Sequence, residues 1–440
     1  MRNNFHEELT AKWQSGVDRS ILKLAVPSIV TNITTPLLAL MDVTVAGHMG
    51  APVYIAAIAV GGSMFNMLYW LFGFLRMGSS GMTAQAYGGG DTRATSTVLR
   101  QALTVALSVG LMMIALQTPL CRIILRFMDT DPTTTAIAER YFRILIWGAP
   151  PYLATFALSG WFLGMQDSRV TMWVSILINV VNIAATLSLV YLLHLGIDGI
   201  ATGTLIAQWT GFIALISVAM HRHGFEGATW RDALHLPQLR RFFKVNTDIF
   251  LRTVCLVAVT MWFTRTGAIQ GERMLAVNAL LMQFFTLFSY FMDGFAFAGE
   301  ALTGRYTGAA DHTMLRRSIR ALLKWGAAMA VIFSVAYLLG GDILLRLLSS
   351  DRGITAAAHD YLPWIATVPL AGFLAFTWDG IFIGATATRR MLLSMLAATV
   401  AFFLVESILF PRLANHGLWL AFITYLLVRG LILTLFSRRL

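Results

Sequence analysis

Long apolar stretches are the feature of this sequence that most limits its fold. A transmembrane helix needs about 20 predominantly apolar residues, and twelve such stretches fit along the 440 residues with short connections between them. Hydrophobic residues make up 57% of the chain and charged residues 12%, which is about half the charged fraction of a soluble domain. The sequence therefore predicts an all-α polytopic membrane protein and excludes a soluble enzyme, a disordered regulator and a secreted disulfide scaffold.

The boundaries of the spans follow from glycine, proline and asparagine clusters between the apolar stretches. The N-terminal 20 residues are too polar for a cleavable signal peptide, so we expect the first span to direct membrane insertion; an interfacial helix and a solvated tail both remain open for this segment. We predict transmembrane helices at 21–47, 53–77, 95–118, 136–164, 170–194, 198–221, 241–266, 275–303, 317–340, 355–384, 391–412 and 417–437.

The distribution of basic residues predicts the orientation, because cytoplasmic loops carry an excess of lysine and arginine. With the N-terminus inside, 22 of the 33 basic residues lie on the cytoplasmic side, nine lie outside and two lie within spans, whereas the acidic residues divide evenly. We therefore expect a multi-pass protein of the cell (inner) membrane with both termini in the cytoplasm. Since topology accounts for the net charge of +11, we expect no nucleic-acid partner.

The two halves of the chain resemble each other at one offset of 220 residues. The matched pairs include Thr83 with Thr303, Gly88 with Gly308, Asp91 with Asp311, Gly160 with Gly380 and Gly164 with Gly384. A single offset across separated regions indicates a duplicated six-helix unit. We predict a cytoplasmic N-terminal segment at 1–20, an N-terminal lobe at 21–221, a cytoplasmic linker at 222–240 and a C-terminal lobe at 241–440. Two pseudo-symmetric lobes would leave a cleft between them, and rocking of the lobes would give alternating access.

Asp42 is the most informative of the six carboxyl groups predicted to lie in the membrane, since each costs at least about 2.5–3.5 kcal/mol at a helix centre. No lysine or arginine follows Lys23 in its span, so no local cation neutralises Asp42 and burial favours its protonated form. Pro27 and Pro36 remove backbone hydrogen bonds and allow the helix to bend. A proton-binding carboxyl on a bendable helix suits proton-driven conformational change. The alternative is an Asp satisfied by neighbouring hydroxyls or amides without a coupling role.

A polar stripe in the fifth span is a candidate partner for Asp42. Asn179, Asn182 and Thr186 recur at helical spacing. Thr204 in the sixth span could face them and complete a hydrogen-bonded cluster. Ordinary polar packing between helices is the alternative reading.

The second half carries its own polar candidates. Asp293 and Glu300 lie seven residues apart on the eighth span and therefore share a face. They could form a second titrating pair, or a structural network with Arg76, Arg305 or another basic residue at the inner ends.

Three further carboxyl groups have expected structural roles. Asp248 and Arg252 stand at i and i+4, which predicts a local ion pair. Asp379 lies toward the cytoplasmic end of the tenth span and is expected to support an inner gate. Glu406 is expected to pack between helices or at the interface.

Several chemistries lack support in the sequence. No phosphate loop, metal-hydrolase motif or nucleophile elbow is present. Cys121 and Cys255 lie in different apolar segments without metal-type spacing. We therefore expect no enzyme activity, no cofactor and no firm metal site, with Na⁺ at Asp42 as the exception that remains open. A membrane-embedded enzyme would need a convergent catalytic set, which the spans do not suggest.

Four motifs resemble the multidrug and toxic compound extrusion (MATE) family, and most closely its DinF-like branch. They are the proline- and threonine-rich segment 27–48, TAQAYG at 83–88, DGFAFAGEA at 293–301 and DGIFIGAT at 379–386. The resemblance covers essentially the whole chain. It implies twelve helices in two six-helix lobes forming a V, and export of drug-like, often cationic compounds in exchange for H⁺ or Na⁺.

The resemblance also implies roles for single residues. Asp42 would be the coupling carboxylate, and the first helix would bend at Pro27. The family's cation cluster often has Asn, then Asp one turn later, in the fifth helix and Thr in the sixth, and these positions correspond to Asn182, Thr186 and Thr204. Thr186 departs from the pattern, and the missing carboxylate weakens a Na⁺ site, so H⁺ coupling is favoured.

The sequence therefore predicts a secondary active multidrug efflux antiporter that works by alternating access, with H⁺ or Na⁺ as its coupling ion. We expect its partners to be small-molecule amphipathic substrates and membrane lipids, and we expect a monomer. A flippase for a lipid-linked precursor is the main alternative. Such a protein would be expected to have a cationic central cavity, whereas the arginines here crowd the cytoplasmic ends.

Overall fold

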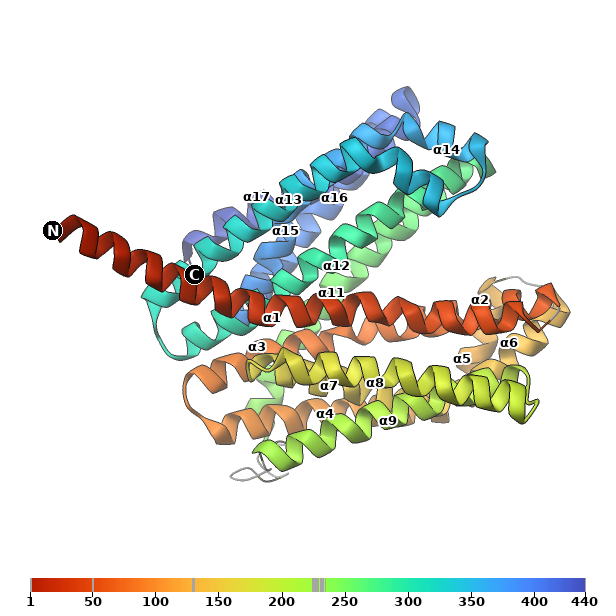
Figure 1. Cartoon of the computed structure of the whole chain (residues 1–440), viewed down its shortest axis with the longest axis horizontal. Coiled ribbons are helices and arrows are strands. Elements are labelled where there is room, and N and C mark those ends of the chain that lie inside the picture. The colour runs from red at the N-terminus through yellow and green to blue at the C-terminus, as the bar shows by residue number, and fades with distance from the viewer. Residues whose placement is uncertain are drawn as a thin grey trace. The chain divides into compact units, whose positions relative to one another are not determined.

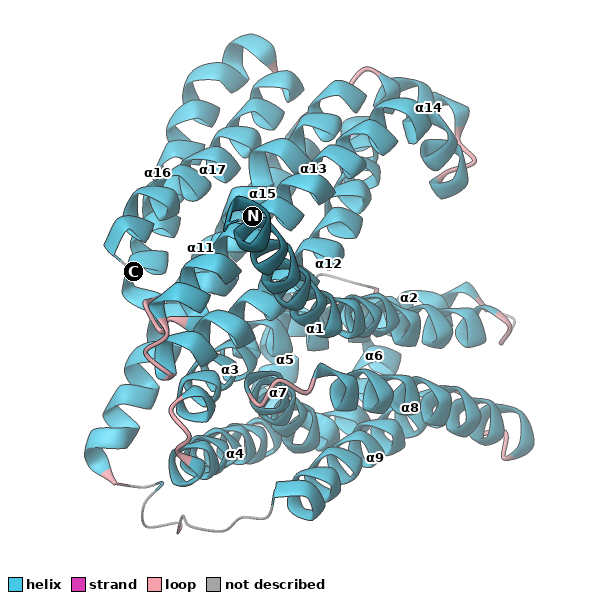
Figure 2. Cartoon of the chain, turned by 60° about the vertical axis from the view of Figure 1, so that its left-hand side comes forward, coloured by secondary structure: helices cyan, strands magenta, loops and turns pink. Residues whose placement is uncertain are grey.

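A computed structural model describes residues 2–49, 51–128, 131–223, 229, 233 and 235–439, and these residues form helices without any strand (Figure 1, Figure 2). The helices of the first half are α1 Arg2–Gly47, α2 Pro52–Trp70, α3 Phe74–Gly88, α4 Thr92–Ala115, α5 Gln117–Met128, α6 Pro132–Leu145, α7 Ala149–Gly164, α8 Ser168–Leu187 and α9 Ile197–His223. Those of the second half are α11 Leu236–Ile269, α12 Glu272–Gly308, α13 His312–Leu348, α14 Arg352–His359, α15 Leu362–Gly384, α16 Thr388–Leu413 and α17 Asn415–Phe436. Four short helical turns complete the described chain: η1 Leu71–Gly73, η2 Ile146–Gly148, η3 Ser188–Leu192 and η4 Ser437–Arg439.

Each of the twelve predicted spans lies on one helix or on consecutive helices. Ten helical stretches within the described residues are long and apolar enough to cross a membrane. The remaining two predicted spans are 136–164, which α6, η2 and α7 share, and 241–266, which lies within α11. The span predicted in α11 carries charged residues such as Asp248 and Arg252. The all-α polytopic class predicted from the sequence is confirmed.

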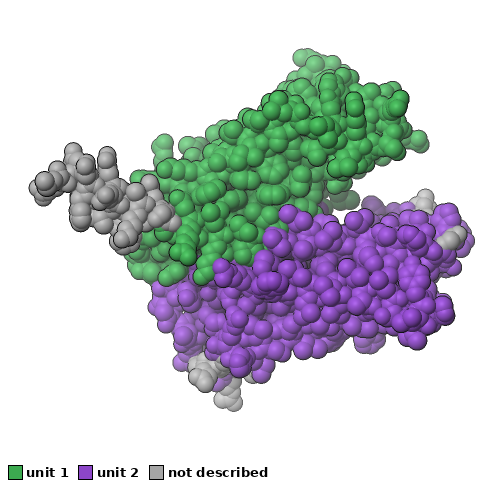
Figure 3. All heavy atoms as spheres, in the orientation of Figure 1, with its two compact units in different colours: residues 1–29, 247–440 green, residues 30–246 purple. Residues whose placement is uncertain are grey.

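The chain divides into two compact units, coloured separately in Figure 3. Unit 1 comprises Met1–Ile29 and Thr247–Leu440, and unit 2 comprises Val30–Asn246. Residues 21–29 thus group with the second half, although the sequence predicted them in the N-terminal lobe. The reason is packing within unit 1, where a Cβ added to Gly294 of α12 would lie 2.3 Å from Ile29 Cγ1 and 3.0 Å from the carbonyl oxygen of Ala25. Residues 241–246 group with unit 2. The predicted linker 222–240 is helical at both ends, and its residues 224–228, 230–232 and 234 lie outside the described residues.

The 220-residue repeat predicted from the sequence is visible in the packing of each unit. A Cβ added to Gly160 would lie 2.1 Å from the carbonyl oxygen of Arg76, and a Cβ added to Gly380 would lie 2.1 Å from that of Ala296. Each glycine therefore permits the same close approach of two helices. The same offset relates three further pairs. Gly164 and Gly384 each lie where two helices approach closely. Asp91 and Asp311 each cap the N-terminus of a helix, and Gln166 and Thr386 each have a positive φ.

Candidate functional site

Asp42 lies near the C-terminal end of α1 and is 5% exposed. Its carboxylate accepts a hydrogen bond from the Thr204 hydroxyl of α9, with 3.1 Å between Thr204 Oγ1 and Asp42 Oδ2. The Tyr141 hydroxyl of α6 donates to the same oxygen at 3.4 Å. Helices α6 and α9 of unit 2 therefore each donate a hydroxyl group to the buried carboxyl of α1, and the coupling role of Asp42 stays a prediction.

A second layer of polar groups lies behind Thr204. The Asn182 amide of α8 donates to Thr204 Oγ1 at 2.9 Å, so that Thr204 links Asn182 to Asp42. Helices α8 and α9 lie side by side (Figure 2). They approach closely because a Cβ added to Gly203 would lie 2.3 Å from Thr186 Oγ1. Within the described part of the chain, Asn182 Oδ1 and Thr186 Oγ1 are buried oxygens without a hydrogen-bond partner.

These oxygens define what the site could hold. Na⁺ takes oxygen ligands, and Asp42, Asn182 and Thr186 each place an oxygen in this region. The site has one carboxylate, however, and the described residues contain no group of three or more His, Cys, Asp or Glu side chains placed to hold a metal ion. A single carboxyl with hydroxyl donors is suited to gaining and losing a proton.

Asn179, Pro27 and Pro36 are the other three residues that the sequence assigned to this site. The Asn179 amide donates to the backbone oxygen of Ser175 at 2.9 Å, one turn earlier in α8, which is a bond within the same helix. Helix α1 is continuous through both prolines, with Pro27 buried and Pro36 exposed. Pro27 precedes by two residues the point where α1 passes from unit 1 to unit 2. The predicted bending at these prolines stays a prediction.

Tyr141 is the site residue that the sequence analysis did not assign to Asp42, because the two residues lie 99 positions apart on different helices. It packs over Gly61 of α2, where an added Cβ would lie 2.5 Å from the tyrosine ring. Aromatic side chains in the same unit extend this packing, with Tyr69 stacked on Tyr152 at a centroid distance of 4.1 Å. Phe142, next to Tyr141 in the chain, stacks on another aromatic ring of α2. These rings form an apolar surrounding next to Tyr141.

The second-half carboxyls form a different kind of site. Asp379 of α15 accepts hydrogen bonds from both Arg252 of α11 and Arg429 of α17, and all three side chains are buried. The predicted ion pair between Asp248 and Arg252 is therefore wrong. Asp248 instead accepts from the Thr388 hydroxyl at 3.0 Å. The guanidinium at i+4 reaches a neighbouring helix because a buried carboxylate there needs compensating charge.

Asp293 and Glu300 belong to the same electrostatic environment. Glu300 is 1% exposed, and both carboxyl groups interact electrostatically with Arg252. Arg252 is thus a basic neighbour of both groups, and the two readings, a titrating pair and a structural network, stay predictions. Glu406 is buried in α16 and accepts from the Thr266 hydroxyl at 3.3 Å, which is helix packing as expected.

The comparison of sequences identifies relatives along the whole chain. The MatE family model matches twice, at residues 27–187 and 248–408, once in each half. The chain is 38% identical over 425 residues to DNA damage-inducible protein F of Escherichia coli (strain K12), covering 96% of this chain and 92% of the relative. It is 26% identical to a probable multidrug resistance protein NorM of Bradyrhizobium diazoefficiens, covering 82% of this chain and 78% of that protein.

The comparison of folds gives the same result at low sequence identity. The crystal structure of the Vibrio cholerae MATE transporter VcmN in the bent form aligns with a TM-score of 0.87 and 15% identity. The alignment covers 97% of each chain. The helices described above therefore form the fold of that transporter.

Proposed function

Because the chain belongs to the MATE family of membrane transporters, we propose that it is a secondary active antiporter that exports amphipathic, often cationic compounds in exchange for H⁺. The observation that carries this proposal is the buried Asp42 carboxyl with its hydroxyl donors from Thr204 and Tyr141. Burying a carboxyl inside the membrane costs free energy, and such residues usually have a functional role. Protonation is a task that a single carboxyl with hydroxyl neighbours can perform.

The proposed cycle uses the charge of Asp42. Ionised Asp42 attracts a cationic substrate, whereas protonated Asp42 is neutral and does not. Binding of a proton from outside therefore releases the substrate on the outer side of the membrane. A ligand shifts a conformational equilibrium only through its different affinities for the two states. The two states must therefore bind the proton differently, and bending of α1 at Pro27 or Pro36 would change the surroundings of Asp42.

Proton rather than Na⁺ is proposed as the coupling ion. Position 186 offers a hydroxyl where a second carboxylate would strengthen cation binding, so the site supplies one negative charge. Na⁺ lowers its energy most where several charged oxygens replace its water. The second-half carboxyl Asp379 already compensates two arginines, and we therefore assign coupling to the Asp42 site and a structural role to Asp379, Asp293 and Glu300.

The proposal also covers the oligomeric state of the protein and its orientation in the membrane. We propose a monomer in the inner membrane with both termini in the cytoplasm, since most basic residues then lie inside. Movement of the two repeated lobes would expose the Asp42 site to each side of the membrane in turn. The relatives are transporters, and the proposal assigns the chain transport and no catalytic reaction.

The proposal is tested by efflux from proteoliposomes with imposed gradients. Purified protein is reconstituted, loaded with a cationic dye, and given a pH gradient or a Na⁺ gradient of equal size. We expect the pH gradient alone to drive dye movement against its concentration gradient. Dye movement driven by Na⁺ and indifferent to pH would contradict H⁺ coupling. The absence of coupled movement of any of several cationic dyes under both gradients would contradict the transport proposal.

Replacement of Thr204 should shift the pH dependence of transport. The Thr204 hydroxyl donates to the charged form of Asp42, so Thr204→Val removes a bond that favours ionisation, and transport should reach half its maximum at a higher pH. A hydrogen bond to a charged group corresponds to a change of about one pH unit. The measurement is the initial efflux rate between pH 5 and 9. Thr204→Ser retains the hydroxyl and should keep the wild-type profile, and identical profiles for all three proteins would remove Thr204 from the coupling site.

A further inference from the structure

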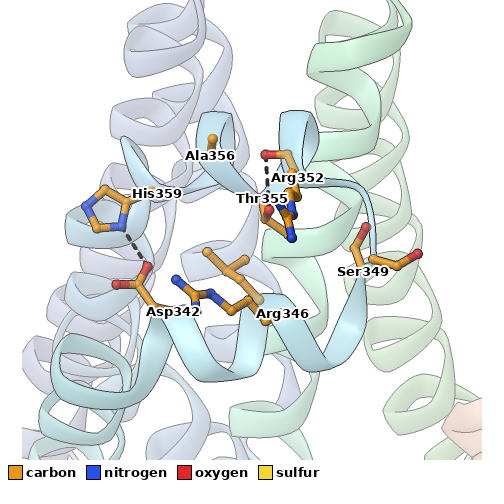
Figure 4. A pocket seen from close by; sticks show the side chains of 9 residues that line it. Asp342, Arg346, Ser349, Arg352, Thr355, Ala356 and His359 are labelled. Atoms are coloured by element: carbon orange, nitrogen blue, oxygen red, sulfur yellow. Dashed lines mark hydrogen bonds and ion pairs between the residues drawn. The ribbon is translucent and has the colours of Figure 1, made fainter.

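A hollow of about 700 Å³ lies within unit 1, apart from both carboxyl sites (Figure 4). The C-terminal part of α13 forms one wall and α14 forms the other. The charge distribution places this end of α13 on the non-cytoplasmic side of the membrane. Its polar lining includes Asp342, Arg346, Ser349, Arg352, Thr355 and His359.

The lining presents two arginines to one space. Arg346 comes from the last turn of α13 and Arg352 from the first turn of α14, and Figure 4 shows both side chains between the two helices. Both are exposed, and neither forms an ion pair within the part of the chain that the structure describes. Two guanidinium groups that line one hollow without ion-pair partners attract an anion.

The nearby acids already have partners. Asp342 Oδ1 lies 2.7 Å from His359 Nδ1. The carboxylate of Asp351 caps α14, where it accepts from the backbone N–H of Gly353 at 2.7 Å and from that of Ile354 at 3.1 Å. These carboxylates are held by bonds other than ion pairs with the two arginines. The lining holds two arginines and one carboxylate, so its net charge is +1 with His359 neutral.

Several contacts hold α14 in position. The Asp342 to His359 contact ties it to α13, and Arg273 of α12 donates to the backbone oxygen of Gly353 at 3.1 Å. The backbone positions of Arg346 and Arg352 are therefore fixed relative to each other. Fixing them in advance reduces the entropy lost when a ligand binds.

We propose that this hollow binds the phosphodiester headgroup of an anionic phospholipid through Arg346 and Arg352. A guanidinium matches phosphate oxygens with paired N–H donors, and two of them can hold one phosphodiester. Leu339, Ile343 and Leu347 are 82%, 73% and 80% exposed on α13 next to the hollow. Such apolar side chains accept acyl chains, which a soluble phosphate lacks.

The test measures lipid retention by the full chain. Protein is purified from mixed micelles of phosphatidylcholine and phosphatidylglycerol, and bound phosphatidylglycerol is counted by native mass spectrometry. The double variant Arg346→Gln/Arg352→Gln should retain less phosphatidylglycerol, by about fivefold for each arginine removed. The matched control is Arg122→Gln/Arg126→Gln on α5, which removes two exposed arginines four residues apart on the same predicted side. It should retain the wild-type amount.

A second measurement separates the sources of phosphate. Thermal unfolding is followed with added phosphatidylglycerol, phosphatidylcholine or glycerol phosphate. Stabilisation of the wild type by phosphatidylglycerol alone, lost in the double variant, supports the lipid site. Equal retention by all three proteins, or equal stabilisation by glycerol phosphate and phosphatidylglycerol, overturns it. Comparable unfolding of the three proteins in phosphatidylcholine shows that the variants are folded, so that these outcomes remain decisive.

Discussion

Asp42→Asn is expected to reduce efflux driven by a pH gradient to the level of liposomes without protein. The amide keeps the shape of the side chain and can still accept a hydrogen bond from Thr204, which lies 3.1 Å from the carboxylate. It cannot bind or release a proton near neutral pH, and it has no negative charge for a cationic substrate. The variant should fold normally because it removes a buried charge and leaves the packing intact.

The control for this result is Glu406→Gln. Glu406 is also a buried carboxyl with a threonine hydroxyl as donor, at 3.3 Å from Thr266, but it lies in the second half of the chain. Its amide variant should retain pH-driven efflux. The measurement is dye efflux from proteoliposomes, with size-exclusion chromatography and thermal unfolding to check folding. Full pH-driven efflux by a well-folded Asp42→Asn protein would remove Asp42 from the mechanism.

Asp379→Asn is expected to cause the largest loss of stability among single substitutions of the membrane carboxyls. Asp379 compensates both Arg252 and Arg429, and all three are buried. The substitution would leave two positive charges in an apolar surrounding without their carboxylate. Removing one partner of a buried ion pair destabilises a protein by about 3–5 kcal/mol. Thermal unfolding in detergent, followed by tryptophan fluorescence, measures the effect.

An exposed ion pair supplies the comparison for this prediction. Asp198 pairs with Arg140, whose side chain is 71% exposed, so Asp198→Asn should cost no more than about 1 kcal/mol. Asp379→Glu keeps the charge and should be less destabilising than Asp379→Asn. If Asp379→Asn unfolds at the same temperature as Asp198→Asn, the charge of Asp379 is not required to hold this cluster together.

The sequence alone was sufficient for the properties that depend on local pattern. Apolar runs of helical length set the fold class, because the interior of a bilayer accepts only backbone whose hydrogen bonds are satisfied within the segment. The repeat could also be recognised, because the close approach of two helices requires glycine at equivalent positions such as Gly160 and Gly380. The burial of Asp42 followed from its place in an apolar span.

Only the tertiary structure decided which polar groups meet. Helical periodicity places a side chain on a face, but the rotation and tilt of a neighbouring helix determine its partner. Tyr141 therefore joins Asp42 across 99 residues of sequence, while Arg252 turns away from the nearby Asp248 to a carboxylate on another helix. A long side chain such as that of Arg252 can pair with a residue on another helix, which residue spacing within one helix does not predict. The pairing compensates a charge that is buried away from water.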